Sequence, residues 1–462
     1  MKFRLLALCA FLWWLCGAFQ IFPLGWVALA PLFLLVHDLP KNERLKWGYF
    51  AGFASFALIN WWLIPTITRG GAAIGASPAL SFVLSLVAVL VIASVHGVQV
   101  LATAAIARGN SPWLPLQMAL IFTFGDWLRC QGVLAHTWGN LGVSQVSDWP
   151  ILWLGQHGLT FLCAFVAFTL GLAIKTKDSG AFLPALTVLV LAHGAGLIGE
   201  PTSKNGPKLR VLAVQTGVSS LRKSGNASGE TPFVQAYRLT LDKVRQKRYD
   251  LILWPETTLE LSKNGEKYGG LNWEILQKMP RGGAKILFGA NVLDENGKRW
   301  NEAILFDGET TKTYAKRRLV PFGERAPFTE ILPFLGNFAP QPMVEIGQKS
   351  PNLRFQGGSP PVNLHAQICF ESCFPLPDEI LGAFFRYGSE LRVVLTNDEW
   401  FIGTEAPRQH RAMAQLRAAE ARAPLVQSAN GAYSFFVDSR GQIVKTTEDG
   451  APQTLEFTVD SP

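Results

Sequence analysis

Apolar residues follow two different patterns along this chain. Up to about residue 200 they form long runs, which we centre near residues 11, 29, 56, 90, 122, 162 and 190. A helix needs roughly 20 mostly apolar residues to cross the hydrocarbon of a bilayer. The first two runs are shorter and are joined through Pro23, which favours a tight hairpin. The pattern predicts a transmembrane domain of about seven helices over residues 1–200.

Residues 201–207 form a polar linker, and beyond them the pattern changes to short β-rich runs bounded by turn residues. Helical patterns at 233–246 and 409–422 lie between some of these runs. Strands that alternate with helices indicate an α/β domain, here over residues 208–462. The predicted strands are Leu209–Gln215, Leu251–Trp254, Ile286–Val292, Ala303–Phe306, Val362–Cys369, Arg392–Thr396, Leu425–Ser428 and Tyr433–Asp438.

The density of charge changes at the same boundary. Residues 1–200 carry 10 of the 42 Lys and Arg residues and 6 of the 34 Asp and Glu residues. The whole chain is 16% charged, compared with about 25% in a typical soluble protein. The net charge of +8 is not gathered into a basic block, so we expect no nucleic-acid partner.

Loop charges predict the orientation, because Lys and Arg are more frequent in cytoplasmic loops. With seven helices and the N-terminus inside, the outer loops carry Arg69 and Arg129, and the inner loops carry Lys2, Arg4, Lys41, Arg44, Lys46, Arg108, Lys175 and Lys177. This bias places the globular domain outside the cytoplasm. The long aromatic loop 126–150 would then face the same side and could form the floor of a lipid site. The alternative is that the helices serve only as an anchor.

Cysteine and histidine usage excludes two kinds of site. Only Cys369 and Cys373, of six cysteines, lie in the globular part, which argues against a disulfide framework. The seven histidines show no metal-ligand spacing. We therefore expect no metal and no cofactor.

Three reactive residues stand at the ends of strand-like segments: Glu256, Lys316 and Cys369. Considered singly, Glu256 would be a surface residue in a turn and Lys316 part of a solvated basic stretch. Cys369 would be a small buried hydrophobic residue. Together they form a catalytic set. Cys369 can act as the nucleophile, and Lys316 can favour its thiolate and later balance an oxyanion. Glu256 can carry the proton, so the trio suffices for acyl transfer.

The order and context of these residues resemble the nitrilase, or carbon–nitrogen hydrolase, superfamily. The chain has W-P-E at 254–256, K-x-x-L-V-P-F-G-E at 316–324, I-C-F-E at 368–371 and N-D-x-W-F at 397–401. The motif Trp138–Gly142 narrows the resemblance to the apolipoprotein N-acyltransferase family, over nearly the whole chain. The resemblance implies a membrane α-helical bundle followed by an extracytoplasmic nitrilase-like αββα sandwich.

The resemblance also implies a two-step reaction. Cys369 takes an acyl chain from a membrane phospholipid, and the N-terminal amine of a diacylglyceryl-cysteine lipoprotein then accepts it as an amide. Supporting roles fall to Glu324 and Glu371, and Phe370 and Trp400 line the site. We expect a monomeric multi-pass enzyme of the bacterial cytoplasmic (inner) membrane.

The sequence departs from this family at a few places. The family usually ends in one more transmembrane helix, whereas this sequence ends at the polar Thr458–Pro462. Segment Gln215–Lys223 lacks a tryptophan that the family often carries. His136 and Thr137 replace a Phe-Pro pair, and Phe370 replaces a common tyrosine. These departures concern anchoring and acceptor recognition more than the triad.

Two other functions fit part of the sequence. A membrane-tethered amidase or nitrilase would use the same triad, and a non-catalytic binding module could retain it as a relic. The apolar segment Phe322–Phe338 favours the acyltransferase, because a lid that accepts lipid has a reason to expose apolar side chains. A buried core loop is the alternative interpretation of this segment.

The predicted orientation can be tested with reporters fused after Pro462. A phosphatase that is active only outside the cytoplasm should work, and a fluorescent protein that matures only in the cytoplasm should stay dark. The opposite result would contradict the orientation and, with it, a lipoprotein substrate.

Overall fold

The computed structural model describes residues 1–73, 75–198, 208–218, 231–348, 352–355, 362–374 and 390–460. The predicted linker 201–207 lies outside these residues. The chain divides into two compact units. The helical unit comprises Met1–Pro201, Thr404–Glu420 and Arg440–Gln442, and the sheet unit comprises Thr202–Gly403, Ala421–Ser439 and Ile443–Pro462.

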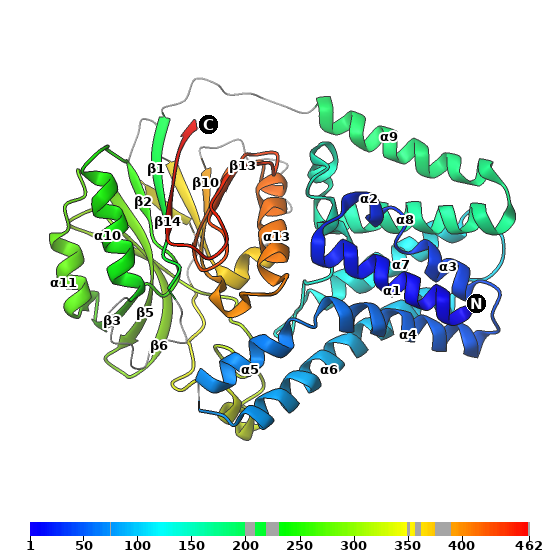
Figure 1. The fold of residues 1–462 in the computed structure, drawn as a ribbon, viewed down its shortest axis with the longest axis horizontal. Helices are drawn as coiled ribbons and strands as arrows, with labels where there is room; N and C mark the ends of the chain where they lie inside the picture. The colour runs from blue at the N-terminus through cyan, green and yellow to red at the C-terminus, as the bar shows by residue number, and fades with distance from the viewer. Residues whose placement is uncertain are drawn as a thin grey trace. The chain divides into compact units, whose positions relative to one another are not determined.

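The helical unit consists mainly of apolar helices (Figure 1). Its longer helices are α1 (Lys2–Phe19), α4 (Lys41–Ile59), α5 (Leu63–Ala73), α6 (Pro78–Ala105), α7 (Leu114–Arg129), α8 (Gly155–Thr176) and α9 (Leu183–Ile198). Shorter pieces lie between them: α2 (Phe22–Gly25), α3 (Ala30–Val36), η1 (Leu141–Gln145), η2 (Trp149–Leu154) and η3 (Ser179–Phe182).

Several of these helices are suited to a bilayer. Within the described residues, four segments are long and apolar enough to cross it: Lys2–Phe19, Pro78–Ala105, Trp149–Thr176 and Ser179–Leu197. Helices α4 and α5 together form a fifth candidate, bent by 51°. The segment Phe22–Val36 is apolar but shorter. The chain is therefore a membrane protein, while the number of crossings stays a prediction.

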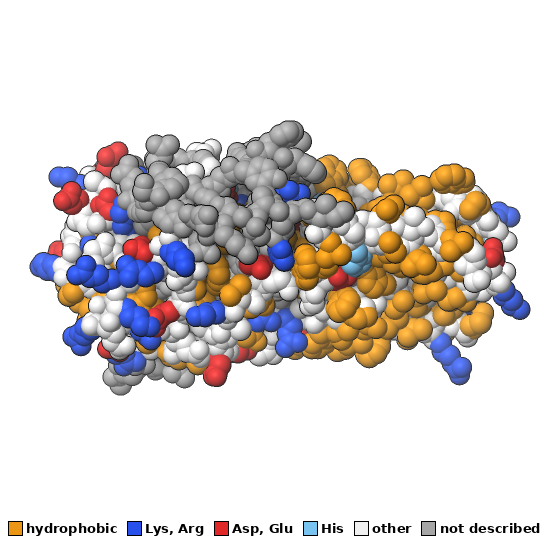
Figure 2. All heavy atoms as spheres, turned by 90° about the horizontal axis from the view of Figure 1, so that it is seen from above, with side chains coloured by type: hydrophobic (Ala, Val, Ile, Leu, Met, Phe, Trp, Pro, Cys, Tyr) orange, Lys and Arg blue, Asp and Glu red, His pale blue; other side chains and the backbone are white. Residues whose placement is uncertain are grey.

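Helix α6 shows how the sequence builds a lipid-facing element. Ser77 caps its start by accepting a hydrogen bond from Leu80 N at 3.2 Å, and Pro78 occupies the first turn. Figure 2 shows hydrophobic side chains gathered over the helical unit. An exposed apolar surface of this extent is typical of contact with lipid. On α6 it includes Leu80, Phe82, Val83, Leu86, Val87, Leu90, Val91, Val95 and Val98.

The sheet unit contains two sheets. The first has the strand order β14-β1-β2-β5-β3-β4, with β6 paired to β5 and β7 paired to β6, and the second has the order β13-β12-β11-β10-β9-β8. Helices α10 (Pro232–Val244) and α11 (Leu271–Lys278) accompany the first sheet. The strands are β1 (Lys208–Gln215), β2 (Leu251–Leu253), β3 (Leu259–Asn264), β4 (Lys267–Gly269), β5 (Lys285–Asp294), β6 (Arg299–Phe306), β7 (Thr311–Ala315), β8 (Asn352–Phe355), β9 (Val362–Ile368), β10 (Glu390–Asn397), β11 (Leu425–Asn430), β12 (Phe435–Val437), β13 (Ile443–Thr446) and β14 (Gln453–Asp460).

Alternation along the strands separates two apolar cores. Successive side chains of a strand point to opposite faces of the sheet. In β1, Val211 joins a core that includes Leu364 of the second sheet, so this core lies between the sheets. Its neighbour Leu212 joins the other core, which contains Phe233 of α10 and Trp273 of α11. The helix layer, the two sheets and the core between them are those of a nitrilase-like sandwich.

All eight predicted strands overlap an observed strand, and six further strands were missed. The missed strands β3, β4, β7, β8 and β13 are short, and their backbone partners are what define them. Strand β14 pairs with β1 over eight residues from the other end of the chain. The strand predicted to end at Cys369 ends at Ile368, because Cys369 already turns away with a φ of 49°.

Candidate active site

Glu256 is delivered to the site by a buried strand and a proline. Strand β2 ends at Leu253, and Trp254 is fully buried, with its Nε1 donating to Thr240 Oγ1 at 2.8 Å. The following turn is held by β5, since Gly289 N donates to Pro255 O at 3.1 Å. Glu256 is therefore placed by backbone contacts, and it is buried.

Gly289 permits this arrangement. A Cβ atom at this position would lie 2.4 Å from Glu256 Cα and 2.7 Å from Pro255 O. Both are backbone atoms, so a side-chain rotation could not relieve the clash. The close approach of β5 to the glutamate turn thus requires glycine, which sequence patterns did not reveal.

Lys316 is a buried cation held between two carboxylates. It follows β7 and is 1% exposed. Its Nζ donates to Glu256 Oε1 and to Glu324 Oε1, both at 3.0 Å. Burial by itself would lower the pKa of Lys316, but the charges of Glu256 and Glu324 outweigh it and raise that pKa well above its ordinary value. The lysine is therefore a fixed positive charge at neutral pH.

Asn301, which sequence patterns did not identify, completes this cluster. It lies on β6, and its Nδ2 donates to Glu256 Oε1 at 2.8 Å and to Glu324 Oε1 at 3.0 Å. Its backbone oxygen accepts from Lys316 N at 2.8 Å. The two carboxylate oxygens thus share the same two donors. Glu324 reaches them across the loop that begins at Lys316.

Cys369 begins a tight turn at the end of β9. It is the first residue of η6 (Cys369–Cys373), and its φ of 49° is a strained conformation for a residue with a side chain. Burial, followed by the nearby Glu256, raises the pKa of the Cys369 thiol well above its ordinary value, and Lys316 only partly opposes them. Lys316 thus acts on the thiol in the predicted direction, against the effect of burial, and its role in favouring the thiolate stays a prediction.

Glu371 joins the lysine loop to the cysteine turn. Its Oε1 accepts from Tyr314 Oη at 2.6 Å and from Arg317 N at 2.7 Å, and its Oε2 accepts from Ile368 N at 2.8 Å. Burial raises the pKa of this carboxyl group, although the bonds from Tyr314 and the amides oppose the shift. Glu371 ties together the segments before Cys369 and after Lys316. Tyr314 is a second residue that the motifs did not identify.

The end of β10 also contacts Glu256. Asn397 N donates to Glu256 Oε2 at 2.9 Å, and Asn430 Nδ2 donates to Asn397 Oδ1 at 3.1 Å. Strands β9 and β10 are parallel neighbours, so the turns after them meet at one edge of the sheet. Trp400, in η7 (Asp398–Phe401), and Phe370 are both partly exposed at these turns. Their predicted contact with substrate stays a prediction.

The segment Phe322–Phe338 is not a buried core loop. Its large apolar side chains are mostly exposed, with Ile331 at 77% and Phe334 at 57%. The carboxylate of Glu324 holds its start, since Oε2 accepts from Val320 N at 2.8 Å. The exposed members are Phe322, Phe328, Ile331, Leu332, Phe334 and Phe338.

Two family models match this chain. The N-terminal domain of apolipoprotein N-acyltransferase matches residues 7–169, and carbon-nitrogen hydrolase matches residues 213–462. The apolipoprotein N-acyltransferase of Azotobacter vinelandii is 30% identical over 453 residues, covering 92% of this chain and 83% of that protein. The chain belongs to the apolipoprotein N-acyltransferase family. The predicted family and the nitrilase-like fold are confirmed.

Other similarities are with another family member and with solved structures. The apolipoprotein N-acyltransferase of Geobacter metallireducens is 28% identical over 446 residues, covering 92% of this chain and 82% of that protein. A crystal structure of an amidase from Nesterenkonia sp. has a TM-score of 0.37 and 16% identity, covering 57% of this chain and 94% of that one. The glutamine-dependent NAD+ synthetase of Acinetobacter baumannii has a TM-score of 0.38 and 14% identity, covering 55% and 46%.

Gly289→Ala should lower the turnover of this acyltransferase strongly while leaving the protein folded. The added methyl group meets the Glu256 turn, so we expect a loss of about 1–3 kcal/mol in the free energy of unfolding. Displacing Glu256 by about 1 Å should lower turnover by about 10²-fold. Thermal unfolding in detergent and an acyl-transfer assay measure the two effects.

Gly194→Ala is the matched control, since a Cβ there would have no heavy atom within 4 Å. It should leave both stability and turnover close to those of the native protein. Native turnover in Gly289→Ala would show that the close approach does not position Glu256.

Proposed function

We propose that this protein transfers a fatty-acyl chain from a membrane phospholipid, through a thioester on Cys369, to the N-terminal amine of a diacylglyceryl-cysteine lipoprotein. The observation that carries the proposal is a buried ion pair between Glu256 and Lys316 in the same domain as the strained turn at Cys369. The N-terminal part of the same chain contains helices that are long and apolar enough to cross a membrane. Family membership supports the same reaction.

The first step forms the thioester. The sulfur of Cys369 attacks the ester carbonyl carbon of the phospholipid while the thiol proton passes to the carboxylate of Glu256. The carbon–oxygen ester bond then breaks, and the lysophospholipid oxygen takes this proton as it leaves. The raised pKa of the Cys369 thiol makes a base in contact with it necessary.

The second step forms the amide. The neutral N-terminal amine of the lipoprotein attacks the thioester carbonyl, and its proton passes to Glu256. The carbon–sulfur bond breaks, and the sulfur leaves with that proton as a thiol. The acyl group ends on nitrogen, and the enzyme returns to its starting state.

Lys316 supplies the charge that both steps need. Each tetrahedral intermediate carries a negative oxygen, and a preorganised cation in a buried site stabilises it without reorganising. Bonds from Lys316 to Glu256 and Glu324 fix the ammonium before substrate arrives. Glu324 and Asn301 therefore act as positioning residues for the lysine.

The exposed apolar segment Phe322–Phe338 supports a lipid donor. A water-soluble substrate gives no reason to expose six large apolar side chains on one loop, whereas an acyl chain does. Its start is tied to Lys316 through Glu324. We propose that this segment is the lid that receives the acyl chain.

The proposal also includes the side of the membrane on which the sheet unit lies. Eight Lys and Arg residues in the predicted inner loops, against two in the outer loops, support a multi-pass protein with its sheet unit outside the cytoplasm. This is the side on which the lipoprotein acceptor would be met. We propose that the enzyme acts there as a monomer.

A trapped acyl group tests the chemistry. With phospholipid present and acceptor absent, the native protein should accumulate a hydroxylamine-sensitive fatty-acyl adduct on Cys369. Cys373 is buried four residues further on. Mass spectrometry should find the adduct in Cys373→Ala and not in Cys369→Ala. Glu256→Gln and Lys316→Met should each slow its formation by about 10²–10⁴-fold, and their losses should not add.

The alternative is a membrane-tethered amidase. An enzyme that hydrolyses amides while Cys369 stays unmodified by phospholipid would establish that activity in place of acyl transfer.

The lid can be tested through its most exposed side chains. The double variant Ile331→Ser with Phe334→Ser removes apolar surface that would contact lipid, so acyl uptake from vesicles should slow by about tenfold or more. The thermal unfolding temperature should stay unchanged, because both side chains are exposed.

Leu271→Ser is the matched control, since Leu271 is 72% exposed on α11. It should alter neither uptake nor stability. A parallel fall in stability and uptake for the lid variant would indicate a packing role instead.

A further inference from the structure

Helix α13 (Ala406–Ala421) lies in the helical unit up to Glu420, and along the chain it connects two strands of the sheet unit. It is the crossover between the parallel strands β10 and β11, yet its residues up to Glu420 pack within the helical unit. It begins five residues after Phe401, the end of the η7 turn that carries Trp400. A short connection, residues 402–405, therefore joins α13 to the edge of the candidate active site.

Two side chains of α13 meet the first turn of α8. Gln156 N donates to Glu420 Oε1 at 2.8 Å. Arg417 Nη2 donates to the same carboxylate oxygen at 2.9 Å and to Gln156 Oε1 at 3.1 Å. The Arg417 side chain is fully buried. We call Gln156, Arg417 and Glu420 the clasp.

Helix α8 depends on the clasp for its start. The first amides of a helix have no partner within it, and a carboxylate is the favoured group near them. Leu154, at the N-cap position of α8, provides no side-chain bond. Glu420, which lies 264 positions after Gln156, takes this role. Gly155 leaves room for it, since a Cβ there would lie 3.1 Å from Glu420 Oε1.

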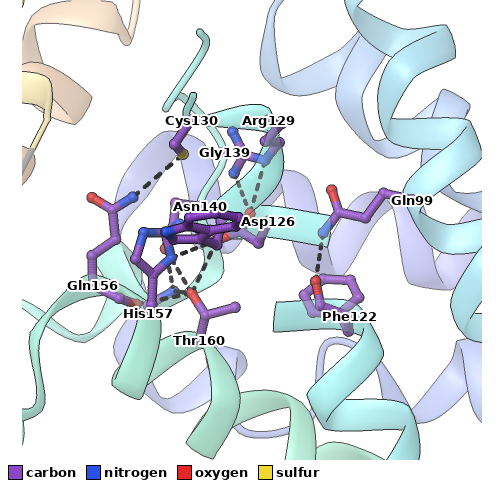
Figure 3. A network of polar contacts seen from close by, with 12 residues as sticks. Gln99, Phe122, Asp126, Arg129, Cys130, Gly139, Asn140, Gln156, His157 and Thr160 are labelled. Carbon is purple, nitrogen blue, oxygen red and sulfur yellow. Dashed lines mark hydrogen bonds and ion pairs between the residues drawn. The ribbon is translucent and has the colours of Figure 1, made fainter. Parts of the chain in front are cut away.

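A buried network extends from the clasp into the helical unit (Figure 3). Gln156 Nε2 donates to Cys130 Sγ at 3.8 Å. Close by, Asp126 pairs with Arg129, whose Nε donates at 2.8 Å, and accepts from Asn140 Nδ2. These groups are all buried, and buried charges are tolerated only when paired. The network therefore has one favourable arrangement rather than many.

The same network presents a loop to α13. Arg129 Nη1 donates to Trp138 O at 3.3 Å, within the motif that the sequence singled out. The Trp138 ring lies 6.4 Å from the His410 ring, and Thr137 Oγ1 lies 3.4 Å from Met413 Sδ. Helix α13 is thus contacted at two places, by the loop that contains Thr137 and Trp138 and by the start of α8.

We propose that the clasp positions α13 and, through it, the η7 turn and the end of β10 at the active site. This inference rests on the proposed function, and it makes Arg417, Glu420 and Gln156 positioning residues. The end of β10 already contacts the catalytic carboxylate, since Asn397 N donates to Glu256 Oε2. Releasing α13 would loosen that contact without removing any group that touches substrate.

Thioester formation in a single turnover separates positioning from simple stability. The amplitude of the acyl burst measures the fraction of enzyme that is correctly folded. The rate constant of the burst depends on the geometry of the active site. Glu420→Ala should lower the rate constant by about 10²-fold at an unchanged amplitude, because small misplacements cost this much. Glu420→Gln keeps an oxygen acceptor for Gln156 N and should restore most of the rate.

Arg422→Ala is the matched control, an exposed arginine directly after the end of α13. It should keep the native rate constant and amplitude. A native rate constant in Glu420→Ala would overturn the proposal. So would a loss of amplitude at an unchanged rate constant, which would mean that the clasp only stabilises the fold.

Alkylation of Cys369 by iodoacetamide provides a second readout that needs no acyl donor. We expect it to slow in Glu420→Ala and to recover in Glu420→Gln, because it depends on the same base. Equal alkylation rates in all variants would overturn the positioning role. If the native protein is alkylated but never forms a thioester, the proposed acyl transfer is wrong. The alkylation rates of the variants would then still decide whether the clasp positions the site.

Discussion

The active site depends on one buried cation. Lys316 is 1% exposed, and a charge removed from water is costly unless its partners are close. Glu256 and Glu324 provide that compensation, and Asn301 supplies a second donor to the same two oxygens. The two carboxylates could not approach each other without the lysine. The group that we propose to stabilise an oxyanion during catalysis is thus also what compensates the two carboxylates in the resting site.

Buried carboxylates recur as connectors between distant segments. Glu371 accepts bonds from the lysine loop and from the turn before Cys369, which fixes the spacing between nucleophile and cation. In the helical unit, Asp126 joins Arg129 and Asn140, and Glu420 joins α13 to the start of α8. Each carboxylate accepts several bonds at once, so each fixes the geometry of more than one element.

The proposed nucleophile, Cys369, lies in a strained and buried turn. Cys369 occupies a left-handed backbone conformation that costs of order 1–3 kcal/mol, which the surrounding strands must offset. Burial raises the pKa of its thiol, and Lys316 opposes this shift. A thiol becomes a strong nucleophile only as its proton leaves, and Glu256 is the base proposed to accept that proton during attack.

Sequence by itself indicated the change of pattern near residue 200, the eight main strands and a candidate triad whose roles stay predictions. These features are local, since the length of an apolar run, the alternation of a strand and a contiguous motif can each be recognised in a single segment. The exposed side chains of Phe322–Phe338, the raised pKa of the Cys369 thiol and the contacts of Asn301, Tyr314 and Gly289 were decided by the tertiary structure. The physical reason is that burial, pKa and steric room depend on neighbours from distant segments, as Glu420 at the start of α8 shows. No local pattern contains those neighbours.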